Sequence, residues 1–309
     1  MAEAGGHVVI IGSVNMDLVV RAPRIPARGE TILGGEFTTI PGGKGANQAV
    51  AVARLGATSV LVGRVGDDDF GGRLLTGLRN CGVDCRHVQR TSGVASGIAL
   101  IVVGDDGDNA ITVASGANFA VTPADVNAAA DVIRTARVCL LQLELPIETV
   151  AHAIQLCRLF NVETILDPAP VPAGPLPKEL LSANIISPNE TEAAALTGLP
   201  VGAEPATVAA ALLDKGAQQV VLKLGSRGAF VAGPDGMRHV EPFAVDVVDT
   251  TAAGDAFTGA LAVARAEGRS LDEAVLFANA AGALACTQHG AQPSMPTLEA
   301  VQGVLGVHV

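Results

Sequence analysis

Short apolar runs alternate with helical patterns along most of the chain. Six runs are rich in Val, Ile and Leu, and most are apolar on both faces, which is typical of strands buried within a parallel sheet. These runs are 8–14, 59–65, 138–144, 162–168, 184–189 and 220–225. The helical patterns between them are 47–55, 71–80, 147–160 and 206–215.

This alternation predicts an α/β fold: a doubly wound, mainly parallel sheet with helices on both faces. Gly56, Gly82 and Gly216 follow three of the predicted helices, at positions where glycine commonly ends a helix. Right-handed crossovers would place ligand-binding loops at the carboxyl ends of the strands.

Two segments, at about 14–40 and 96–115, interrupt the alternation. They contain strand-like pieces at 30–40, 97–103 and 109–115, and the sequence 104–107 between the last two is typical of a hairpin turn. We predict that they form a small antiparallel sheet, a lid that projects from a single α/β domain spanning 1–309. The alternative is that these pieces are edge strands of the main sheet.

From residue 254 to residue 290 the pattern is nearly all helical. The first of these helices begins with Ala252, Ala253 and Gly254, whose small side chains leave their N–H groups accessible. Unpaired N–H groups and the helix dipole predict a phosphate site there. A phosphate would repel the neighbouring Asp255, which suits a base that takes a proton from an attacking hydroxyl. The alternative is that Asp249 or Asp255 only caps a helix.

A second stretch of small residues, 42–47, precedes the helix predicted near Asn47. Asn15 and Asp17 follow the first strand, and Glu144 ends another. Such paired donors and acceptors at the carboxyl edge of a sheet suit the hydroxyls of a sugar. The alternatives are a solvated loop lysine at Lys44 and a helix cap at Asn47.

Two further turns follow predicted strands. In 188–193, Glu192 either belongs to a capping box with Asn189 or orients water on a metal ion. In 224–228, the glycines would admit a flat or phosphorylated ligand. No His, Cys and Asp residues cluster with the spacing of a transition-metal site.

Composition narrows the class of protein. Apolar residues make up 49% of the 309 residues and charged residues 17%, which indicates a large core rather than disorder. Lys and Arg number 20 against 31 Asp and Glu, a net charge of −11, so neither a nucleic acid nor a membrane surface is expected as a partner. An odd count of five cysteines without a CxxC motif indicates reduced thiols, and with no signal peptide pattern we expect a cytoplasmic protein.

Several of these stretches, in this order along the chain, resemble the signature segments of a known protein family. The segment 42–51 (GGKGANQAVA) is similar to the first signature of the ribokinase-type carbohydrate kinase family, and 249–257 (DTTAAGDAF) to its second. The segments 188–193 and 224–228 also match the family, and the resemblance extends along the chain from residues 12–17 to residues 290–296. It implies a doubly wound α/β domain with a small β lid, and ATP-dependent phosphorylation of ribose at its 5-hydroxyl. The alternatives are another sugar or nucleoside kinase of the family and, less favoured, a non-catalytic sensor.

The resemblance also assigns roles to residues. Ribose would be held by Asn15, Asp17, Gly43, Lys44, Asn47, Glu144 and Asp255. Asp255 would be the catalytic base, and Ala252, Ala253 and Gly254 the anion hole. ATP would contact Asn189, Lys223, Gly225, Ser226, Arg227, Gly228, Gly254 and Asn279.

Ions and a partner subunit are implied as well. Mg²⁺ would accompany ATP near Glu192. An activating K⁺ would lie at Asp249, Thr251, Ala285, Gln288, Gly290 and Ser294. The family further implies a homodimer formed through the lid, and we expect an apolar lid face made by Ile98, Leu100, Val102, Ile111 and Val113.

Overall fold

The structure, a computed structural model, describes residues 7–174 and 176–306. Its main sheet has nine strands in the order β13-β12-β11-β10-β9-β8-β1-β4-β5. The seven strands that pair in parallel are β1 (Val8–Ile11), β4 (Ser59–Gly66), β5 (Val83–Thr91), β8 (Val138–Leu141), β9 (Glu163–Leu166), β10 (Ile185–Ile186) and β11 (Gln219–Lys223). The antiparallel pair β12 (Ala229–Gly233) and β13 (Gly236–Val240) forms one edge.

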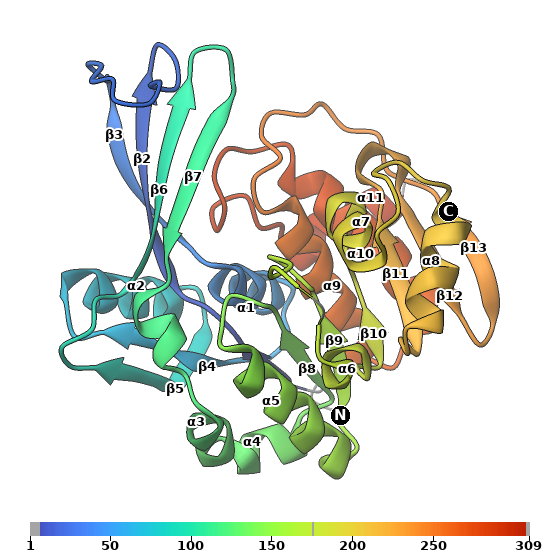
Figure 1. The fold of residues 1–309 in the computed structure, drawn as a ribbon. Helices are drawn as coiled ribbons and strands as arrows, with labels where there is room; N and C mark the ends of the chain where they lie inside the picture. Colours follow the sequence, from blue (N-terminus) through green and yellow to red (C-terminus); the bar gives the residue numbers. More distant parts are fainter. Residues whose placement is uncertain (1–6, 175, 307–309) are drawn as a thin grey trace.

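Helices cover both faces of this sheet, as predicted (Figure 1). One face is covered by α1 (Lys44–Arg54), α2 (Asp69–Asn80), α9 (Ala253–Ala266), α10 (Leu271–Ala285) and α11 (Leu298–Gly306). The other is covered by α3 (Pro123–Ala128), α4 (Ala130–Thr135), α5 (Ile147–Phe160), α6 (Lys178–Leu181), α7 (Glu190–Thr197) and α8 (Pro205–Asp214).

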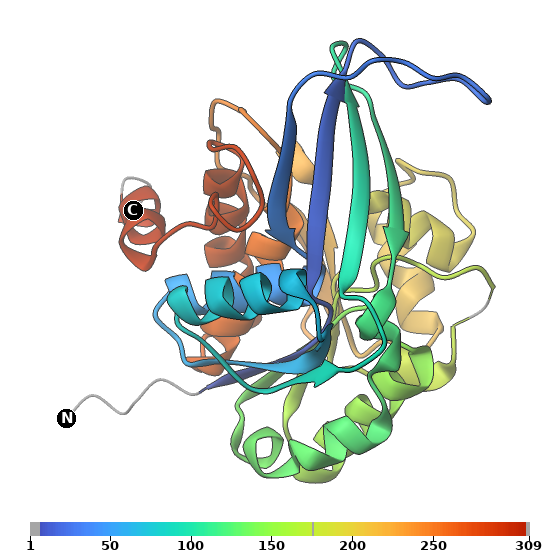
Figure 2. The same ribbon diagram turned by 90° about the vertical axis from the view of Figure 1, so that its left-hand side faces the viewer.

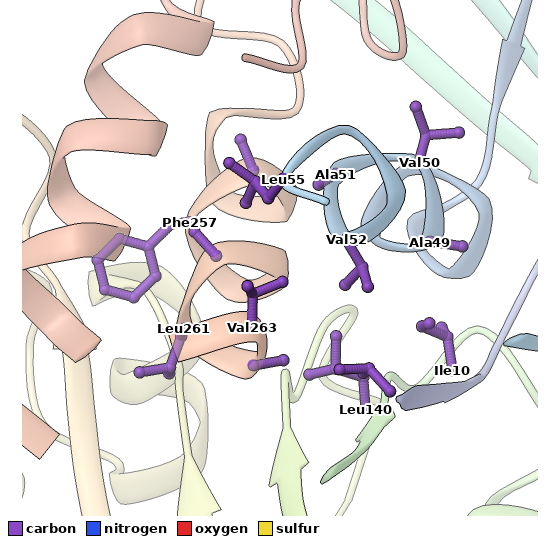
Figure 3. Packing of buried hydrophobic residues seen from close by; sticks show 14 of the residues in the cluster. Ile10, Ala49, Val50, Ala51, Val52, Leu55, Leu140, Phe257, Leu261 and Val263 are labelled. Carbon is purple, nitrogen blue, oxygen red and sulfur yellow. The ribbon is translucent and has the colours of Figure 1, made fainter. Parts of the chain in front are cut away.

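Strand β1 shows how the chain fills both cores. Val8 and Ile10 belong to the core under α1 and α9, whereas Val9 and Ile11 belong to the core on the opposite face. Successive side chains of a strand point to opposite faces, so a strand apolar at every position serves two helix layers. Figure 3 shows Ile10 and Val52 in the first of these cores.

The lid is a separate sheet that stands out from the main body (Figure 2). Its strands β2 (Asn15–Ala22), β3 (Phe37–Gly42), β6 (Gly97–Gly104) and β7 (Asn109–Ala114) have the order β3-β2-β6-β7. The edge-strand alternative is therefore wrong. Two details of the prediction are also wrong: β2 and β6 pair in parallel, and 30–36 form no strand.

The register of the lid corrects the predicted apolar face. Leu100 lies opposite Thr112, whereas Ile101 lies opposite Ile111 and Ala99 opposite Val113. Residues directly opposite each other share a face, so Leu100 faces away from Ile111 and Val113. Each face of the lid is therefore partly apolar.

Some predicted boundaries also move. Helix α1 begins at Lys44, immediately after Gly43, rather than near Asn47.

All five cysteines are free thiols. Within the described residues, no helix is long and apolar enough to cross a membrane.

Candidate active site

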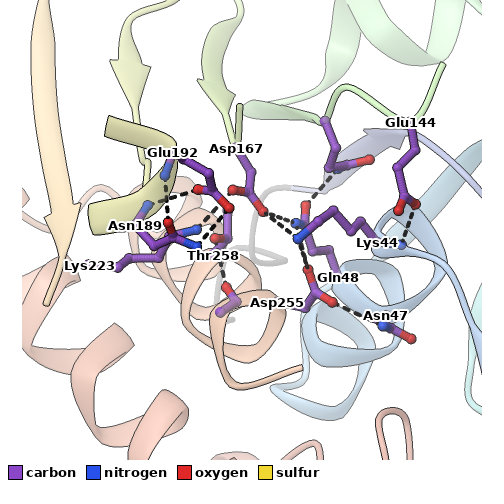
Figure 4. Close-up of polar contacts among 12 residues, drawn as sticks. Lys44, Asn47, Gln48, Glu144, Asp167, Asn189, Glu192, Lys223, Asp255 and Thr258 are labelled. Carbon is purple, nitrogen blue, oxygen red and sulfur yellow. Dashed lines mark hydrogen bonds and ion pairs between the residues drawn. The ribbon is translucent and has the colours of Figure 1, made fainter. Parts of the chain in front are cut away.

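Several of the predicted polar residues meet where β1, β8 and β9 end, near the starts of α1 and α9. Figure 4 shows Lys44, Asn47 and Asp255 close together there, with Glu144 nearby. Two glycines let α1 begin against the end of β1. Gly43 has φ +89, in the left-handed region. A Cβ on Gly45 would lie 2.5 Å from the backbone of Gly12 and Ser13, so only glycine allows this approach.

Asp255 lies in the first turn of α9 and is 5% exposed. Asn47 Nδ2 donates to its Oδ2 at 2.9 Å, Gln48 Nε2 donates to its Oδ1 at 3.1 Å, and Lys44 Nζ is 3.9 Å from Oδ1. The N-cap of α9 is Ala252, and no side chain caps it. The alternatives of a helix cap at Asp255 and at Asn47 are therefore wrong, as is that of a solvated Lys44.

The start of α9 is built from backbone alone. Ala252 adopts φ 58, a left-handed conformation that is uncommon outside glycine, and Ala253 and Gly254 follow as the first helical residues. N–H groups without large side chains at a helix start can bind an anionic oxygen, although Ala253 N donates to Thr250 O at 3.2 Å in the structure. The nearest side-chain atom to a Cβ on Gly254 would be Lys223 Nζ, at 3.8 Å.

Asp249 joins the loop before α9 to the loop after α10. Its Oδ1 accepts from Thr251 N and its Oδ2 from Gly290 N, both at 2.9 Å. Burial acts to raise the pKa of Asp249, but the hydrogen bonds from Gly290 and Thr251, together with the charge of His289, lower the pKa below its usual value. Among the other residues predicted for a cation, Ala285 ends α10, Thr251 and Gln288 are exposed, and the Ser294 hydroxyl donates to Ala291 O at 2.8 Å.

The sequence prediction missed Asp167, which lies one residue beyond β9 and is fully buried. Lys223 Nζ is 2.8 Å from its Oδ1, and Lys44 Nζ is 3.8 Å from its Oδ2. Burial acts to raise the pKa of Asp167, but the two ammonium groups and the Gln48 amide lower it below its usual value. The signal that could have found it is an aspartate directly after an apolar strand, at the same sheet edge as Glu144.

On the lid side, Asn15 and Asp17 point from β2 on one face. Burial, together with the charges of Glu144 and Asp255, raises the pKa of Asp17 to about 7. Glu144 Oε2 accepts from Lys44 N at 3.1 Å and from the Ser13 hydroxyl.

Asn118, also missed, orients Asn15. Its Oδ1 accepts from Val14 N at 2.9 Å, so its Nδ2 is the atom that donates to Asn15 Oδ1 at 2.7 Å. The acceptor of Asn15 is thereby engaged, and its amide nitrogen is left as the donor. A Cβ on Gly97 would lie within 2.3 Å of both amides, so glycine is required beside them.

The predicted capping box at the start of α7 is confirmed. Asn189 Oδ1 accepts from Glu192 N, and Glu192 Oε2 accepts from Asn189 N, both at 2.8 Å. Burial raises the pKa of Glu192, and the Asp167 charge adds to this effect against the opposing charges of Lys223 and Lys44. Among the described residues, no group of three or more His, Cys, Asp and Glu could hold a metal ion.

The predicted nucleotide residues lie farther along the sheet. Gly225, Ser226 and Arg227 form the short helical turn η2 (Gly225–Arg227) after β11, and Arg227 pairs with Glu190 at 2.5 Å. Gly228 has φ 80. Asn279, on α10, donates from Nδ2 to Glu241 O at 2.9 Å and Val240 O at 3.3 Å, so its amide nitrogen holds the 240–241 segment.

Comparison with known proteins agrees with this fold. Residues 6–298 match the pfkB family carbohydrate kinase. A ribokinase of Bacillus subtilis is 41% identical over 97% of this chain and 99% of its own length, and a deoxyribokinase of Salmonella typhi is 35% identical over 94% and 96%. The structure of Arabidopsis thaliana ribokinase complexed with ribose and ATP superposes with a TM-score of 0.91 at 36% identity, covering 97% of this chain and 99% of that one.

Together with the match to this family, the doubly wound sheet and its separate lid indicate an ATP-dependent carbohydrate kinase. The chain belongs to the pfkB family of carbohydrate kinases.

Proposed function

We propose that this protein phosphorylates D-ribose at its 5-hydroxyl with ATP, giving ribose 5-phosphate and ADP. The observation that carries the proposal is the placement of Asp255, between the sugar-side residues of the lid and the backbone N–H groups that open α9. The high identity to curated ribokinases over nearly the whole chain supports ribose as the sugar.

Donors and acceptors alternate around the proposed sugar site. Asn15 offers its amide nitrogen, because Asn118 occupies its oxygen. Glu144 keeps Oε1 as an acceptor. Asn47 Oδ1 is buried and has no hydrogen-bond partner among the described residues, so it can accept from a hydroxyl. A sugar hydroxyl both donates and accepts, so it can pair with each of these groups.

Asp255 is the proposed general base. It accepts the proton of the sugar hydroxyl as the oxygen attacks the γ-phosphoryl group, whose growing charge is taken up by the N–H groups of Ala252, Ala253 and Gly254. Lys44, 3.9 Å from Asp255, adds a positive charge beside the reacting groups.

Different parts of the chain would bind the two implied ions, Mg²⁺ and K⁺. Mg²⁺ usually takes one or two carboxylates together with substrate phosphates, and the half-buried Glu192 near Asp167, whose oxygens accept from Asn189, would suit this role. When bound, it would neutralise phosphate charge. K⁺ would lie at the two loops that Asp249 already joins, where its carboxylate and backbone carbonyls would provide oxygen ligands. We further propose a cytoplasmic location, because the five thiols are free.

A nucleoside kinase is less well supported than a sugar kinase. Phe37 is the only aromatic residue of the lid strands, and it lies opposite Val20. Alternation along β2 therefore puts Phe37 on the face away from Asn15 and Asp17, where it cannot cover a base bound at the sugar site. Deoxyribose is the stronger competitor, because a deoxyribokinase is 35% identical.

A substrate screen tests the proposal. Initial rates of ADP release would be measured with ribose, 2-deoxyribose, fructose, fructose 6-phosphate and adenosine. We expect kcat/KM to be highest for ribose. A higher value for any other substrate would reassign the substrate, and binding of ribose without turnover of any substrate would indicate a sensor.

A further inference from the structure

We propose that Gln48 is a positioning residue that fixes the carboxylate of Asp255, and that Gln142 fixes Gln48 in turn. The inference rests on the proposed role of Asp255 as the base. It concerns two buried amides that no part of the proposed mechanism uses, both fully buried at the centre of the site.

The Gln48 amide joins two carboxylates. From α1, its Nε2 donates to Asp255 Oδ1 at 3.1 Å and to Asp167 Oδ2 at 3.0 Å. A primary amide has two N–H bonds, so both are used. Through Gln48, Asp255 is thus connected to Asp167 at the end of β9, in addition to accepting from Asn47 on α1.

The two carboxylates determine which way the Gln48 amide points, and Gln142 holds the oxygen of that amide in place. Lying one residue beyond β8, Gln142 donates from Nε2 to Gln48 Oε1 at 2.6 Å. If the Gln48 amide turned over, its oxygen would face two carboxylates and its nitrogen would face another N–H donor. A Cβ on Gly12 would lie 2.1 Å from Gln142 Oε1, so the absence of a side chain at Gly12 makes room for this amide.

Asp167 provides a rigid anchor for the far end of Gln48. Its other oxygen is 2.8 Å from Lys223 Nζ, and Lys44 Nζ lies 3.8 Å from Oδ2, so its charge is balanced where it is buried. Gln48 therefore connects Asp255 to the ion pair between Asp167 and Lys223. Each oxygen of Asp255 retains a second lone pair to accept the sugar proton.

The test uses two variants of similar volume, Gln48→Met and Gln142→Met. For Gln48→Met, kcat should fall by about 100-fold, since a small misplacement of a reacting group costs about this much. Ribose affinity, measured by calorimetry without nucleotide, should hardly change. Gln142→Met should show a smaller fall in kcat, although Gln142 touches neither carboxylate. The double variant should be no slower than Gln48→Met alone, because Gln142 acts through Gln48.

Thr149→Val is the matched control. Thr149 is fully buried and its hydroxyl donates to Val121 O at 3.0 Å, but it lies on α5, across the sheet from α1. This variant should lower the melting temperature and leave kcat unchanged. If Gln48→Met fails to fold, Gln142→Met still carries the test.

The outcomes separate this inference from the proposed function. Unchanged kcat in both Gln variants of an active enzyme would overturn the positioning role, as would independent, additive losses in the double variant. A parent protein that phosphorylates no sugar would instead count against the proposed function, and with it the base that Gln48 is said to position.

Discussion

At the scale of single residues, two aspartates of the site, Asp255 and Asp17, lie in different surroundings. Asp255 is held by N–H donors from α1, whereas Asp17 comes from the lid and lies near the carboxylates of Glu144 and Asp255. Substitution by asparagine keeps the shape of either residue and removes its charge, so each can be tested separately.

For Asp255→Asn, we expect kcat to fall by about 10²–10⁴-fold, the usual contribution of a general base. Ribose affinity should fall far less, because the amide still fills the same space. Steady-state kinetics and calorimetry would measure the two effects. A kcat close to that of the parent enzyme would show that Asp255 is not the base.

The raised pKa of Asp17 predicts a pH-dependent stability. Between about pH 4 and pH 7, folded Asp17 retains a proton that it loses in the unfolded chain, where its pKa is near 3.8. The folded state binds more protons there, so this residue makes the free energy of unfolding fall as pH rises through that window, and the effect levels off above pH 7.

Asp17→Asn should remove this slope. Without ligand, the variant should therefore gain stability relative to the parent as the pH is raised from 4 to 8 in chemical denaturation experiments. Equal pH slopes for the two proteins would contradict the assignment to Asp17.

At the scale of elements, the start of α9 depends on the loop before it. Its N–H groups must be ordered before phosphate arrives, because donors that are ordered only during the reaction lose much of their effect. Asp249 supplies part of this order by bonding both Thr251 and Gly290.

We predict that K⁺ activates the enzyme well above Na⁺, acting on kcat more than on ribose binding, by ordering the same two loops. Initial rates would be measured with KCl or NaCl at constant ionic strength. Asp249→Ala should lose most of the difference between the two salts. Equal rates of the parent enzyme with and without K⁺ would mean that its anion hole is ordered without a cation.

At the scale of the whole molecule, the lid leaves apolar side chains in solvent. Phe37 is 60% exposed and Leu100 49%, and both lie on the face opposite that of Asp17. No helix covers this part of the sheet in Figure 2. Exposed apolar sheet faces of this kind are commonly buried by a partner.

We therefore predict a homodimer formed through the lids, measured by sedimentation at micromolar concentration. Leu100→Glu should shift the protein toward monomer. Leu159→Glu is the matched control, because Leu159 is 73% exposed on α5, away from the lid, and should leave the dimer intact. A fully active monomer of the parent protein would refute the prediction.

The sequence by itself determined the alternation of strands and helices, the lid segments and the start of α9. These follow from local properties: apolar runs for buried strands, small residues for a backbone-built site, and glycines at helix ends. The antiparallel edge β12–β13 was not predicted, although it follows β11 directly. The sequence predicts the start of α1 three residues too late, because the small residues around Gly43 and Lys44 are typical of a loop.

Only the tertiary structure decided which side chains meet. Gln48 and Asp255 are 207 residues apart, and nothing near Gln48 in sequence indicates that its amide bonds two carboxylates. Strand register likewise decided that Leu100 and Ile111 lie on opposite faces of the lid sheet, because a shift of one position moves a side chain to the other face. Local pattern specifies elements, whereas contacts across the site depend on how those elements pack, and the roles of Asp167, Asn118 and Gln48 arise from that packing.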